Sequence, residues 1–456
     1  MYKGKMLKIQ RAPSDWEIIG QEEGFAKIAV AVTVEDNIND DTDFEIPFSE
    51  DKMFARIVNE ESGESVSSPV RLLKNGSVCE CVIDKIPCGG PYLLDFIILD
   101  KANNIDCPLV CRRRRHFYVG DVYIIAGQSN AAGMAKGFLT EEAEKGIHVL
   151  RNMEYWDIAT QPFNDLDYSK YGMFISFAKK LKKETGRPIG LIPAAMGGAP
   201  LSRWLKDENG DLSEKLVNTL KEKGIKPKAV LWYQGCSDVW EDDDPRSYIE
   251  RFKRFTGFLR EDLKCEKLPF FTFQLNRQKF KENDPENGLR YDCLREAQRL
   301  AAKEINNVYV IPSIDSLIMT DFIHNGKASN VMLGERLALN VLDKLYGIGK
   351  GADAPEILSG HLEGDKIILR FANVSEFLYA FNVSPECFPI KIEDGSGIIG
   401  IKDYEISGDT VKLFLKRKAE GGVFVSGQSG NSPENIIEDY GTGIPMLCFY
   451  KFRIEE

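Results

Sequence analysis

The central part of this chain alternates short apolar runs with stretches of helical periodicity, and this alternation constrains the fold most. Candidate strands are "VYIIAG" (122–127), "IGLIPAA" (189–195), "AVLWYQG" (229–235), "PFFTFQL" (269–275) and "NVYVIPS" (307–313). Helical stretches lie between them, such as "FISFAKKLKKETG" (174–186), and a last helix is expected over "NVMLGERLALNVLDKLYG" (330–347). Apolar strands that alternate with helices are typical of a parallel sheet covered on both faces. The central region therefore predicts an α/β domain.

Both flanks of this region have the patterning of β-rich modules. Polar and apolar residues alternate in "FAKIAVAVTVED" and "MFARIVN", and Gly, Asn, Asp and Pro separate such runs. Gly and Pro gather again in "GIGKGADAPEI" (347–357), and strand-like runs such as "KIILRFANV" follow. We therefore expect a sandwich-like or jelly-roll-like module over 1–117, the α/β domain over 118–350 and a second β-rich module over 351–456.

Charge and hydropathy exclude several classes of partner. The formal net charge is -11, whereas nucleic acids and anionic membranes attract basic surfaces, so neither is an expected partner. The one basic run, Arg112–Arg115, is interpreted as a solvated or acid-paired domain edge. No run approaches ~18 apolar residues, and the N-terminus lacks the apolar segment of a secretory signal. These features predict a soluble cytoplasmic protein and leave its oligomeric state open.

The sequence predicts neither a metal site nor a cofactor. It has four histidines and no HExxH motif, and the pairs Cys79/Cys81 and Cys107/Cys111 lack a second pair at zinc-site spacing. The ten cysteines are dispersed through a long chain, which favours reduced thiols over a disulfide framework. A phosphate-binding GxxxxGK[ST] loop is also absent from the sequence.

Small and polar residues gather where the predicted strands end, which is where parallel α/β sheets bind ligands. The segments are Gly127-Gln128-Ser129-Asn130, Met196-Gly197-Gly198-Ala199-Pro200, Gln234-Gly235 and the loop Asp321-Phe322-Ile323-His324 before the last helix. A serine hydroxyl needs a neighbouring base to become a nucleophile, and a carboxylate orients that base. We therefore predict a catalytic triad of Ser129, His324 and Asp321.

Acyl transfer also needs hydrogen-bond donors for the oxyanion that develops during attack. The backbone N–H groups of Gly197 and Gly198 and the side-chain amide of Gln234 are the candidates. Each segment could also have a purely structural role, because serines and glycine pairs are common in turns and a single histidine is often a packed core residue. Their coincidence at successive strand ends favours the catalytic interpretation.

These segments resemble those of the SGNH/GDSL hydrolase superfamily, and within it the sialate O-acetylesterase-like carbohydrate esterases. "VGDVYIIAGQSNAAGM" resembles the nucleophile block, "PIGLIPAAMGGAPLSRW" the glycine block, "LWYQGCSD" the WYQGE block, and "DFIHNGKASNVMLGERLA" the Asp-x-x-His block. "IPCGGPYLLDF" and "GIPMLCFYKFR" resemble the flanking β modules. The resemblance implies an SGNH-type three-layer α/β/α domain with a parallel sheet, flanked by N- and C-terminal β-sandwich-like modules.

The resemblance also implies roles for individual residues. Ser129 would be the nucleophile, His324 the general base and Asp321 its orienting residue, without a metal. The oxyanion hole would consist of the N–H groups of Ser129 and of Gly198 or Gly197, with the Gln234 side chain. The chain departs from the family at Cys236, which replaces a glutamate; this change removes a hydrogen-bond acceptor beside the site.

The implied function is removal of O-acetyl groups from a carbohydrate through an acetyl-enzyme. Sialic acid is the first candidate substrate, and acetylated xylan or another acetylated sugar is the alternative. Candidate substrate contacts are Gln128, Asn130, Arg203, Trp204, Arg277 and Arg295, of which an arginine suits a sialate carboxylate and the tryptophan a sugar face. Surface ion pairs or core packing would explain the arginines and Trp204 equally. A catalytically weak sugar-binding homologue and a scaffold protein also remain open.

Overall fold

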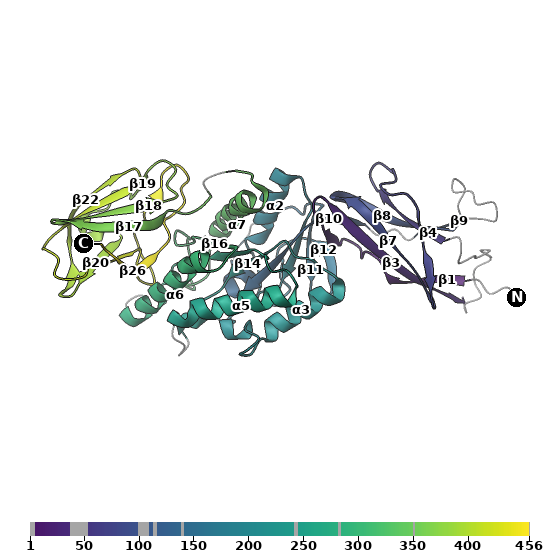
Figure 1. The fold of residues 1–456 in the computed structure, drawn as a ribbon, viewed down its shortest axis with the longest axis horizontal. Helices are drawn as coiled ribbons and strands as arrows, with labels where there is room; N and C mark the ends of the chain where they lie inside the picture. Colours follow the sequence, from purple (N-terminus) through teal and green to yellow (C-terminus); the bar gives the residue numbers. More distant parts are fainter. Residues whose placement is uncertain are drawn as a thin grey trace.

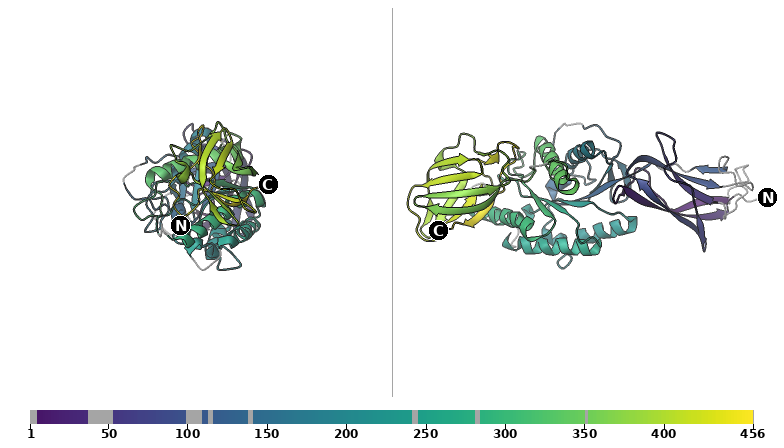
Figure 2. Two further views of the ribbon diagram at one scale, coloured as in Figure 1. Left: turned by 90° about the vertical axis from the view of Figure 1, so that its left-hand side faces the viewer. Right: turned by 45° about the horizontal axis from the view of Figure 1, so that its top comes forward.

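Three parts follow one another along the long axis of the molecule. The computed structural model describes residues 5–36, 53–98, 109–112, 116–137, 141–240, 245–280, 284–349 and 352–455. Figure 1 shows a β-rich part at the N-terminal end, a central sheet with helices, and a second β-rich part at the C-terminal end, and Figure 2 shows the same order from other directions. Each part has its own cluster of buried apolar residues. The predicted mixed α/β class with several sheets is confirmed.

The central sheet has the strand order β12-β11-β13-β10-β14-β15-β16. The bounds are β10 (Phe117–Gly127), β11 (Ile147–Arg151), β12 (Tyr155–Ile158), β13 (Ile189–Pro193), β14 (Ala229–Tyr233), β15 (Phe270–Phe273) and β16 (Val308–Ile311). Neighbouring strands are parallel except β12, which is antiparallel to β11. Strands β10, β11, β13, β14 and β15 are buried at every residue, as a parallel sheet covered on both faces requires. The sequence analysis did not anticipate β11 and β12.

The N-terminal part consists of strands whose polar and apolar residues alternate. They are β1 (Lys5–Arg11), β2 (Ile18–Gly20), β3 (Phe25–Asp36), β4 (Met53–Asn59), β5 (Val70–Arg71), β6 (Leu73–Asn75), β7 (Val78–Pro87), β8 (Gly89–Ile98) and β9 (Leu109–Arg112). One antiparallel sheet has the order β1-β3-β7-β6, and β4 pairs with β5 and β8. Residues 113–115 of the basic run and Cys107 lie outside the described residues.

Strand β10 connects the N-terminal part to the central sheet. Its first residues pair with β2 and β8, and its later residues pair with β13 and β14. Gly120 lies at the crossover, where a Cβ would lie 2.1 Å from the Pro188 carbonyl oxygen. A single strand therefore crosses the expected division between residues 117 and 118, and its buried length leads to the loop of the predicted nucleophile.

Helices flank the central sheet, with α2 and α7 on one side and α3, α5 and α6 on the other in Figure 1. Their bounds are α2 (Phe174–Thr185), α3 (Asp211–Lys223), α5 (Tyr248–Asp262), α6 (Pro285–Glu304) and α7 (Lys327–Val341). Helices α2 and α7 approach closely at Gly334, where a Cβ would lie 2.3 Å from the Met173 carbonyl oxygen. The expected helix over 174–186 is confirmed, and the last helix begins at Lys327, three residues before its expected start.

The C-terminal part is again formed by strands. They are β17 (Glu356–Glu363), β18 (Lys366–Ala372), β19 (Leu378–Tyr379), β20 (Ile390–Asp394), β21 (Gly397–Ile399), β22 (Ile401–Ser407), β23 (Thr410–Leu415), β24 (Phe424–Gly427), β25 (Glu438–Asp439) and β26 (Phe449–Arg453). Two four-stranded sheets have the orders β17-β18-β23-β22 and β21-β20-β24-β26. The sandwich-like character of both flanking modules and the SGNH-type layering stay predictions.

The carboxyl ends of the parallel strands face the C-terminal part. Strand β10 enters from the N-terminal part and runs toward the C-terminal one (Figure 1). After β15, the side-chain amide of Gln274 donates to the Cys448 carbonyl oxygen at 2.9 Å, and its oxygen accepts from Cys448 N–H at 2.8 Å. The loops that carry the predicted catalytic residues therefore lie on the side of the sheet that contacts the C-terminal part.

Candidate active site

Ser129 lies directly after β10, at the start of the short helix α1 (Ser129–Ala132). The turn requires Gly127, which has a φ of +125° and whose Cβ, if present, would lie 2.3 Å from the Tyr233 carbonyl oxygen. The N–H of Gln128 donates to the same carbonyl at 2.9 Å. This close approach to β14 ends the strand, and it leaves Ser129 at the carboxyl edge of the sheet with 8 % of its surface exposed.

Asp321 and His324 form a hydrogen-bonded pair in the loop before α7. The carboxylate oxygen Oδ2 of Asp321 lies 3.0 Å from Nδ1 of His324, and Oδ1 accepts from the backbone N–H groups of His324 at 3.1 Å and of Ile323 at 3.3 Å. Burial would raise the pKa of Asp321, but the hydrogen bonds from His324 and these N–H groups outweigh it, so the pKa lies below its usual value. The carboxylate is therefore ionised at neutral pH and can orient the imidazole.

The loop of Ser129 and the loop of His324 are joined through Asn130. Its Oδ1 accepts from the backbone N–H of Asn325 at 3.0 Å, and its Nδ2 donates to the Ile323 carbonyl oxygen at 3.5 Å. Asn276, after β15, donates to the same Ile323 carbonyl at 3.2 Å. The residues on both sides of His324 are thus held against the residue that follows Ser129. The amide of Asn130 has this structural use, so its expected contact with substrate is not supported.

The two glycines of the predicted oxyanion hole differ in whether their backbone N–H groups already have a hydrogen-bond acceptor. Gly197 N–H donates to the hydroxyl of Tyr168 at 2.8 Å. Gly198 has a φ of +69°, and its carbonyl accepts from the Ser237 hydroxyl at 3.1 Å. Among the described residues, no hydrogen bond engages the N–H of Ser129 or of Gly198. Of the two alternatives, Gly198 therefore retains a free donor and Gly197 does not.

Gln128 fastens this region instead of facing a substrate. Its Oε1 accepts from the N–H of Gly235 at 2.9 Å and of Ser237 at 3.4 Å, and the residue is 3 % exposed. The side chain therefore holds the loop after β14 against the loop after β10. This contact gives Gln128 Oε1 a structural use, and the expected contact of the residue with substrate stays a prediction.

The expected role of Gln234 in the oxyanion hole is not supported by the structure. The side chain is fully buried, and its Nε2 donates to the Ala199 carbonyl at 3.2 Å and to the Asp238 carboxylate. Its Oε1 accepts from the Tyr248 hydroxyl at 3.0 Å. Both amide hydrogens are therefore used inside the protein, and none is available for an oxyanion.

Three of the expected substrate contacts have partners elsewhere. Trp204 is 0 % exposed and packs edge-on against Trp232 at a centroid distance of 5.3 Å, so it cannot stack on a sugar. The guanidinium of Arg203 pairs with the Asp211 carboxylate through Nε at 3.1 Å and Nη2 at 2.5 Å. Arg295 is also fully buried. It donates to four backbone carbonyls, those of Leu275, Asn276, Gly430 and Asn431. These are structural roles.

Arg277 is the last of the six expected contacts and differs from the others. Within the described part of the chain, no hydrogen bond or ion pair engages its guanidinium. It lines a pocket of about 290 Å³ beside the Asp321–His324 loop. It therefore remains available to a ligand.

Cys236, which replaces the glutamate of the family motif, begins the short helix α4 (Cys236–Trp240) and is 2 % exposed. Burial raises the pKa of its thiol to about 12. At neutral pH the thiol is therefore protonated and supplies neither a charge nor a nucleophile.

Two polar residues that hold these loops in place were not predicted from the sequence. Asp238 accepts from Leu201 N–H at 3.1 and 3.2 Å and pairs with Arg251 at 3.3 Å, so it anchors the glycine block. Asn276 donates to the Asn325 side chain at 2.7 Å and so supports the histidine loop. Asp238 follows β14 closely and Asn276 follows β15. A polar residue just after a predicted strand is the sequence signal that could have identified them.

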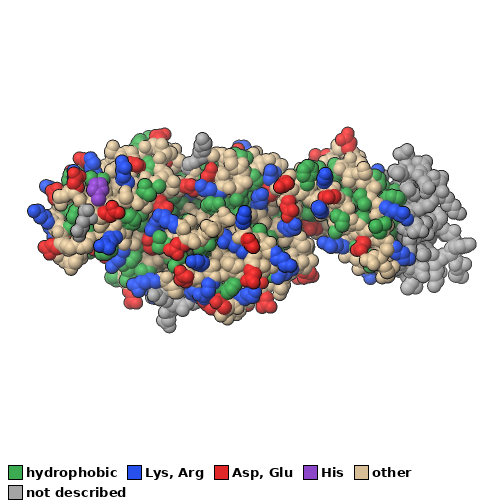
Figure 3. Space-filling view, viewed as in Figure 1, with side chains coloured by type: hydrophobic (Ala, Val, Ile, Leu, Met, Phe, Trp, Pro, Cys, Tyr) green, Lys and Arg blue, Asp and Glu red, His purple; other side chains and the backbone are tan. Residues whose placement is uncertain are grey.

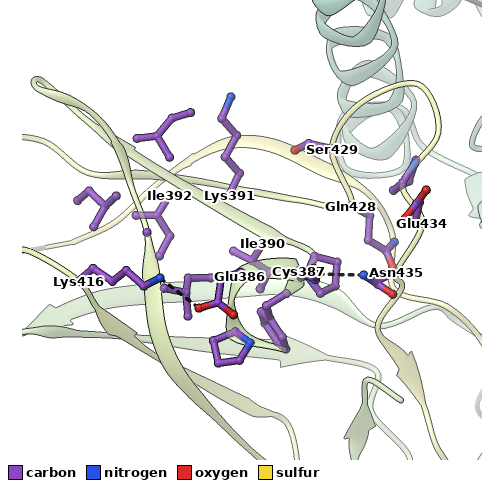
Figure 4. Close-up of a pocket in the computed structure, with 18 residues that line it drawn as sticks. Glu386, Cys387, Ile390, Lys391, Ile392, Lys416, Gln428, Ser429, Glu434 and Asn435 are labelled. Atoms are coloured by element: carbon purple, nitrogen blue, oxygen red, sulfur yellow. Dashed lines mark hydrogen bonds and ion pairs between the residues drawn. The ribbon is translucent and has the colours of Figure 1, made fainter. Parts of the chain in front are cut away.

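A second pocket, of about 490 Å³, lies in the C-terminal part and apart from these loops (Figure 4). Two polar pairs lie in its lining: Lys416 binds Glu386 at 3.2 Å, and Asn435 donates to the Cys387 carbonyl at 3.0 Å. Acidic and basic residues also alternate over the face in Figure 3 without a large patch of one sign. The chemistry therefore concentrates at the carboxyl edge of the central sheet.

Two further structural findings concern metals and membranes. In the described ranges, no three or more His, Cys, Asp and Glu side chains gather closely enough to hold a metal ion. Over the same residues, no helix combines the length and apolar composition needed to cross a bilayer.

Comparison with known proteins places this site in a family. The model of the family described as "Carbohydrate esterase, sialic acid-specific acetylesterase" matches residues 119–343. A probable carbohydrate esterase of Arabidopsis thaliana is 30% identical over 242 residues, which are 48% of this chain and 88% of that protein. A carbohydrate acetylesterase from Xanthomonas citri, XAC1771, has a similar fold, with a TM-score of 0.68, 19% identity and coverage of 97% of this chain and 99% of that one. The chain therefore belongs to the same family of carbohydrate esterases as this Arabidopsis relative and is a carboxylic ester hydrolase, as the sequence motifs predicted.

Proposed function

We propose that this protein is a metal-independent serine esterase that removes O-acetyl groups from a carbohydrate through Ser129, His324 and Asp321. The observation that carries the proposal is the pair of hydrogen bonds that join Asn130 to the residues on either side of His324: Asn130 donates to the Ile323 carbonyl and accepts from the Asn325 N–H. They hold the base-bearing loop next to the residue that follows the nucleophile. The family membership supports the reaction class.

The reaction follows from the protonation states of these groups. Nδ1 of His324 donates to the ionised Asp321, which leaves Nε2 as the acceptor for the Ser129 proton. As the Ser129 oxygen attacks the acetyl carbonyl, His324 becomes positively charged and Asp321 stabilises that charge. The bond between the acetyl carbon and the sugar oxygen then breaks, and the imidazolium gives its proton to that oxygen, so the sugar leaves as an alcohol and an acetyl-enzyme remains. A water molecule that His324 deprotonates releases acetate and restores Ser129.

The negative charge on the tetrahedral intermediate needs fixed donors. The N–H groups of Ser129 and Gly198 have no protein acceptor in the described residues and lie on adjacent loops of the sheet edge. Backbone donors of this kind stabilise the transition state without reorganisation, and each contributes about 2.7–4 kcal/mol where measured. We assign the oxyanion hole to these two groups and omit Gln234.

The first candidate substrate is an O-acetylated sialic acid, in accord with the description of the family model. Acetylated xylan fragments and other neutral acetylated sugars are the second candidate, since the chemistry at the acetyl group is the same whichever sugar carries it. A homologue that binds a sugar without hydrolysing it is the third possibility, and the replacement at Cys236 favours testing it.

The test is the variant Ser129→Ala with p-nitrophenyl acetate as substrate. We expect kcat to fall by on the order of 10⁴-fold or more, because the covalent step is lost. Ser62→Ala, on an exposed turn, is the matched control and should retain full activity. A Ser129→Ala variant as fast as the parent would assign the nucleophile elsewhere.

The substrate and the silent alternative need separate measurements. Acetate release is compared for O-acetylated N-acetylneuraminate, acetylated xylo-oligosaccharides and cephalosporin-type acetates. Labelling of the native chain by a serine-directed organophosphonate, lost in Ser129→Ala, would support catalysis. Measured binding of a glycan, together with no labelling and no acetate release, would support the sugar-binding alternative.

A further inference from the structure

Residues 196–199 form a tight turn shortly after β13, and this turn carries one of the two proposed oxyanion donors. The N–H of Ala199 donates to the Met196 carbonyl oxygen at 3.3 Å, and Gly198, the third residue of the turn, has a φ of +69°. A positive φ at this position is typical of a type II turn and favours glycine. The conformation of the turn therefore sets the direction of the Gly198 N–H.

Little packing holds Gly198 in place. The residue is exposed, and within the described chain a Cβ built on it would have no atom within 4 Å apart from its chain neighbours. Glycine has more backbone conformations available than other residues, so a pair of glycines changes shape easily. An oxyanion hole, by contrast, is effective because its donors are fixed before the reaction. The turn therefore needs hydrogen bonds from other segments to hold its donor in one position.

Tyr168 holds the first peptide of the turn. Its hydroxyl accepts from the Gly197 N–H at 2.8 Å and donates to the Met196 sulfur at 3.4 Å. The ring lies so close to Gly197 that a Cβ at this position would be 2.8 Å from the hydroxyl oxygen and 2.9 Å from two ring carbons. One side chain therefore both binds and covers the start of the turn.

The segment that follows Tyr168 is attached to α1, the helix of the predicted nucleophile. The hydroxyl of Ser169, a buried residue, donates to the Ala132 carbonyl oxygen at 3.1 Å. The N–H of Lys170 donates to the Gly133 carbonyl oxygen at 2.8 Å. The segment therefore connects the C-terminal end of α1 to the glycine turn.

Ser237 makes a matching connection to the other end of α1. Its hydroxyl donates to the Gly198 carbonyl oxygen at 3.1 Å, and its backbone N–H donates to Oε1 of Gln128 at 3.4 Å. Gln128 immediately precedes Ser129, so this route ends where the helix begins. The turn is therefore tied to both ends of the helix that carries the other proposed donor, the Ser129 N–H.

We propose that Tyr168 and Ser237 are positioning residues that fix the distance between the two N–H donors of the oxyanion hole. The inference rests on the proposed esterase function, because it concerns the oxyanion hole of that site. Tyr168 holds the peptide before the Gly198 donor, and Ser237 holds the peptide after it, so both act without touching the substrate. When either bond is lost, the turn gains conformational freedom, and its donor spends less time where the negative charge develops.

The variants Tyr168→Phe and Ser237→Ala each remove one hydroxyl. Tyr168 is 39 % exposed, so water can replace its hydroxyl as the partner of the Gly197 N–H, and the midpoint of thermal unfolding should stay nearly unchanged. We expect kcat/KM for p-nitrophenyl acetate to fall about 10-fold in each variant, which is less than the ~10²–10³-fold cost of removing a whole oxyanion donor. Ser237→Thr keeps a hydroxyl and should recover most of the activity that Ser237→Ala loses.

Tyr155→Phe is the matched control. Tyr155 is an exposed tyrosine on β12 of the same central sheet, so its variant makes the same chemical change away from the glycine turn. Its kcat/KM should equal that of the parent.

Inhibition by trifluoroacetone provides a readout that a purely structural role would not change. The Ser129 oxygen adds to the ketone carbon, and the oxygen of the resulting hemiketal carries the negative charge that the tetrahedral intermediate would carry. The inhibition constant should rise about 10-fold in each variant, in proportion to the loss of kcat/KM. A variant that only folds less well would show fewer sites labelled by a serine-directed organophosphonate, and the remaining sites would keep the inhibition constant of the parent.

The outcomes separate this inference from the proposed function. A parent enzyme that trifluoroacetone does not inhibit and the organophosphonate does not label would refute the proposed function, and this inference with it. An inhibited parent whose kcat/KM and inhibition constant are unchanged in both Tyr168→Phe and Ser237→Ala would overturn the inference alone. A loss of activity that is explained entirely by fewer labelled sites would overturn it as well.

Discussion

The substitution Asn130→Ala tests whether hydrogen bonds between two loops align the catalytic groups. It removes the acceptor of the Asn325 N–H, which lies at 3.0 Å from Asn130 Oδ1 in a buried position. The Ile323 carbonyl keeps a donor, because Asn276 also binds it at 3.2 Å, and its 3.5 Å bond to Asn130 is long. One buried donor is thus orphaned, which costs about 1–3 kcal/mol of unfolding free energy.

The effect on activity should appear in kcat. The Asp321–His324 pair is local to its loop and survives the substitution, whereas the alignment of His324 with Ser129 relaxes. We expect kcat/KM for p-nitrophenyl acetate to fall about 10- to 100-fold, which corresponds to about 1.4–2.7 kcal/mol of transition-state stabilisation. KM should change little, because Asn130 does not face the substrate.

The assay combines p-nitrophenyl acetate kinetics with urea unfolding followed by tryptophan fluorescence. Asn75→Ala is the matched control: its amide donates to Glu80 on the exposed surface of the N-terminal part, so stability and activity should be almost unchanged. If Asn130→Ala lost stability as expected and retained the full kcat, the loop contact would not position the base, and the reasoning on the site would be refuted.

Two further predictions concern Gln234 and His148. Gln234→Ala should lower the free energy of unfolding by about 1–3 kcal/mol, because Asp238 and Tyr248 each lose a hydrogen-bond partner. A large loss of kcat with unchanged stability would instead indicate that Gln234 belongs to the oxyanion hole. Burial lowers the pKa of His148 to about 4, so below pH about 6.5 only the unfolded chain takes up its proton. The unfolding free energy should therefore fall by up to about 3 kcal/mol as the pH drops from about 6.5 to 4. Urea titrations at several pH values in this range measure how the unfolding free energy depends on pH. In His148→Asn this dependence should become weaker; if it stayed the same, His148 would not be its cause.

The elements that the sequence predicted are those whose signal is local. The apolar runs of β10, β13, β14, β15 and β16 were recognisable because every side chain of a doubly covered strand tends to be apolar. Strands β11 and β12 escaped, since "IHVLR" and "YWDI" are short and contain charged residues whose burial or exposure depends on neighbours. His148 and Arg151 are buried there only because other segments supply hydrogen-bond partners for them.

The sequence by itself determined the local relations on which the proposed chemistry rests: a serine placed where a buried strand must end, and a histidine three residues from a carboxylate. Such relations span a few residues and survive any arrangement of the rest of the chain. Only the tertiary structure decided which polar side chains remain free. Gln234 binds Ala199, Trp204 packs against Trp232 and Arg295 binds Gly430, and each of these partners is distant in sequence. Arg277 is left without a partner, because the availability of a hydrogen-bond donor depends on everything that packs around it.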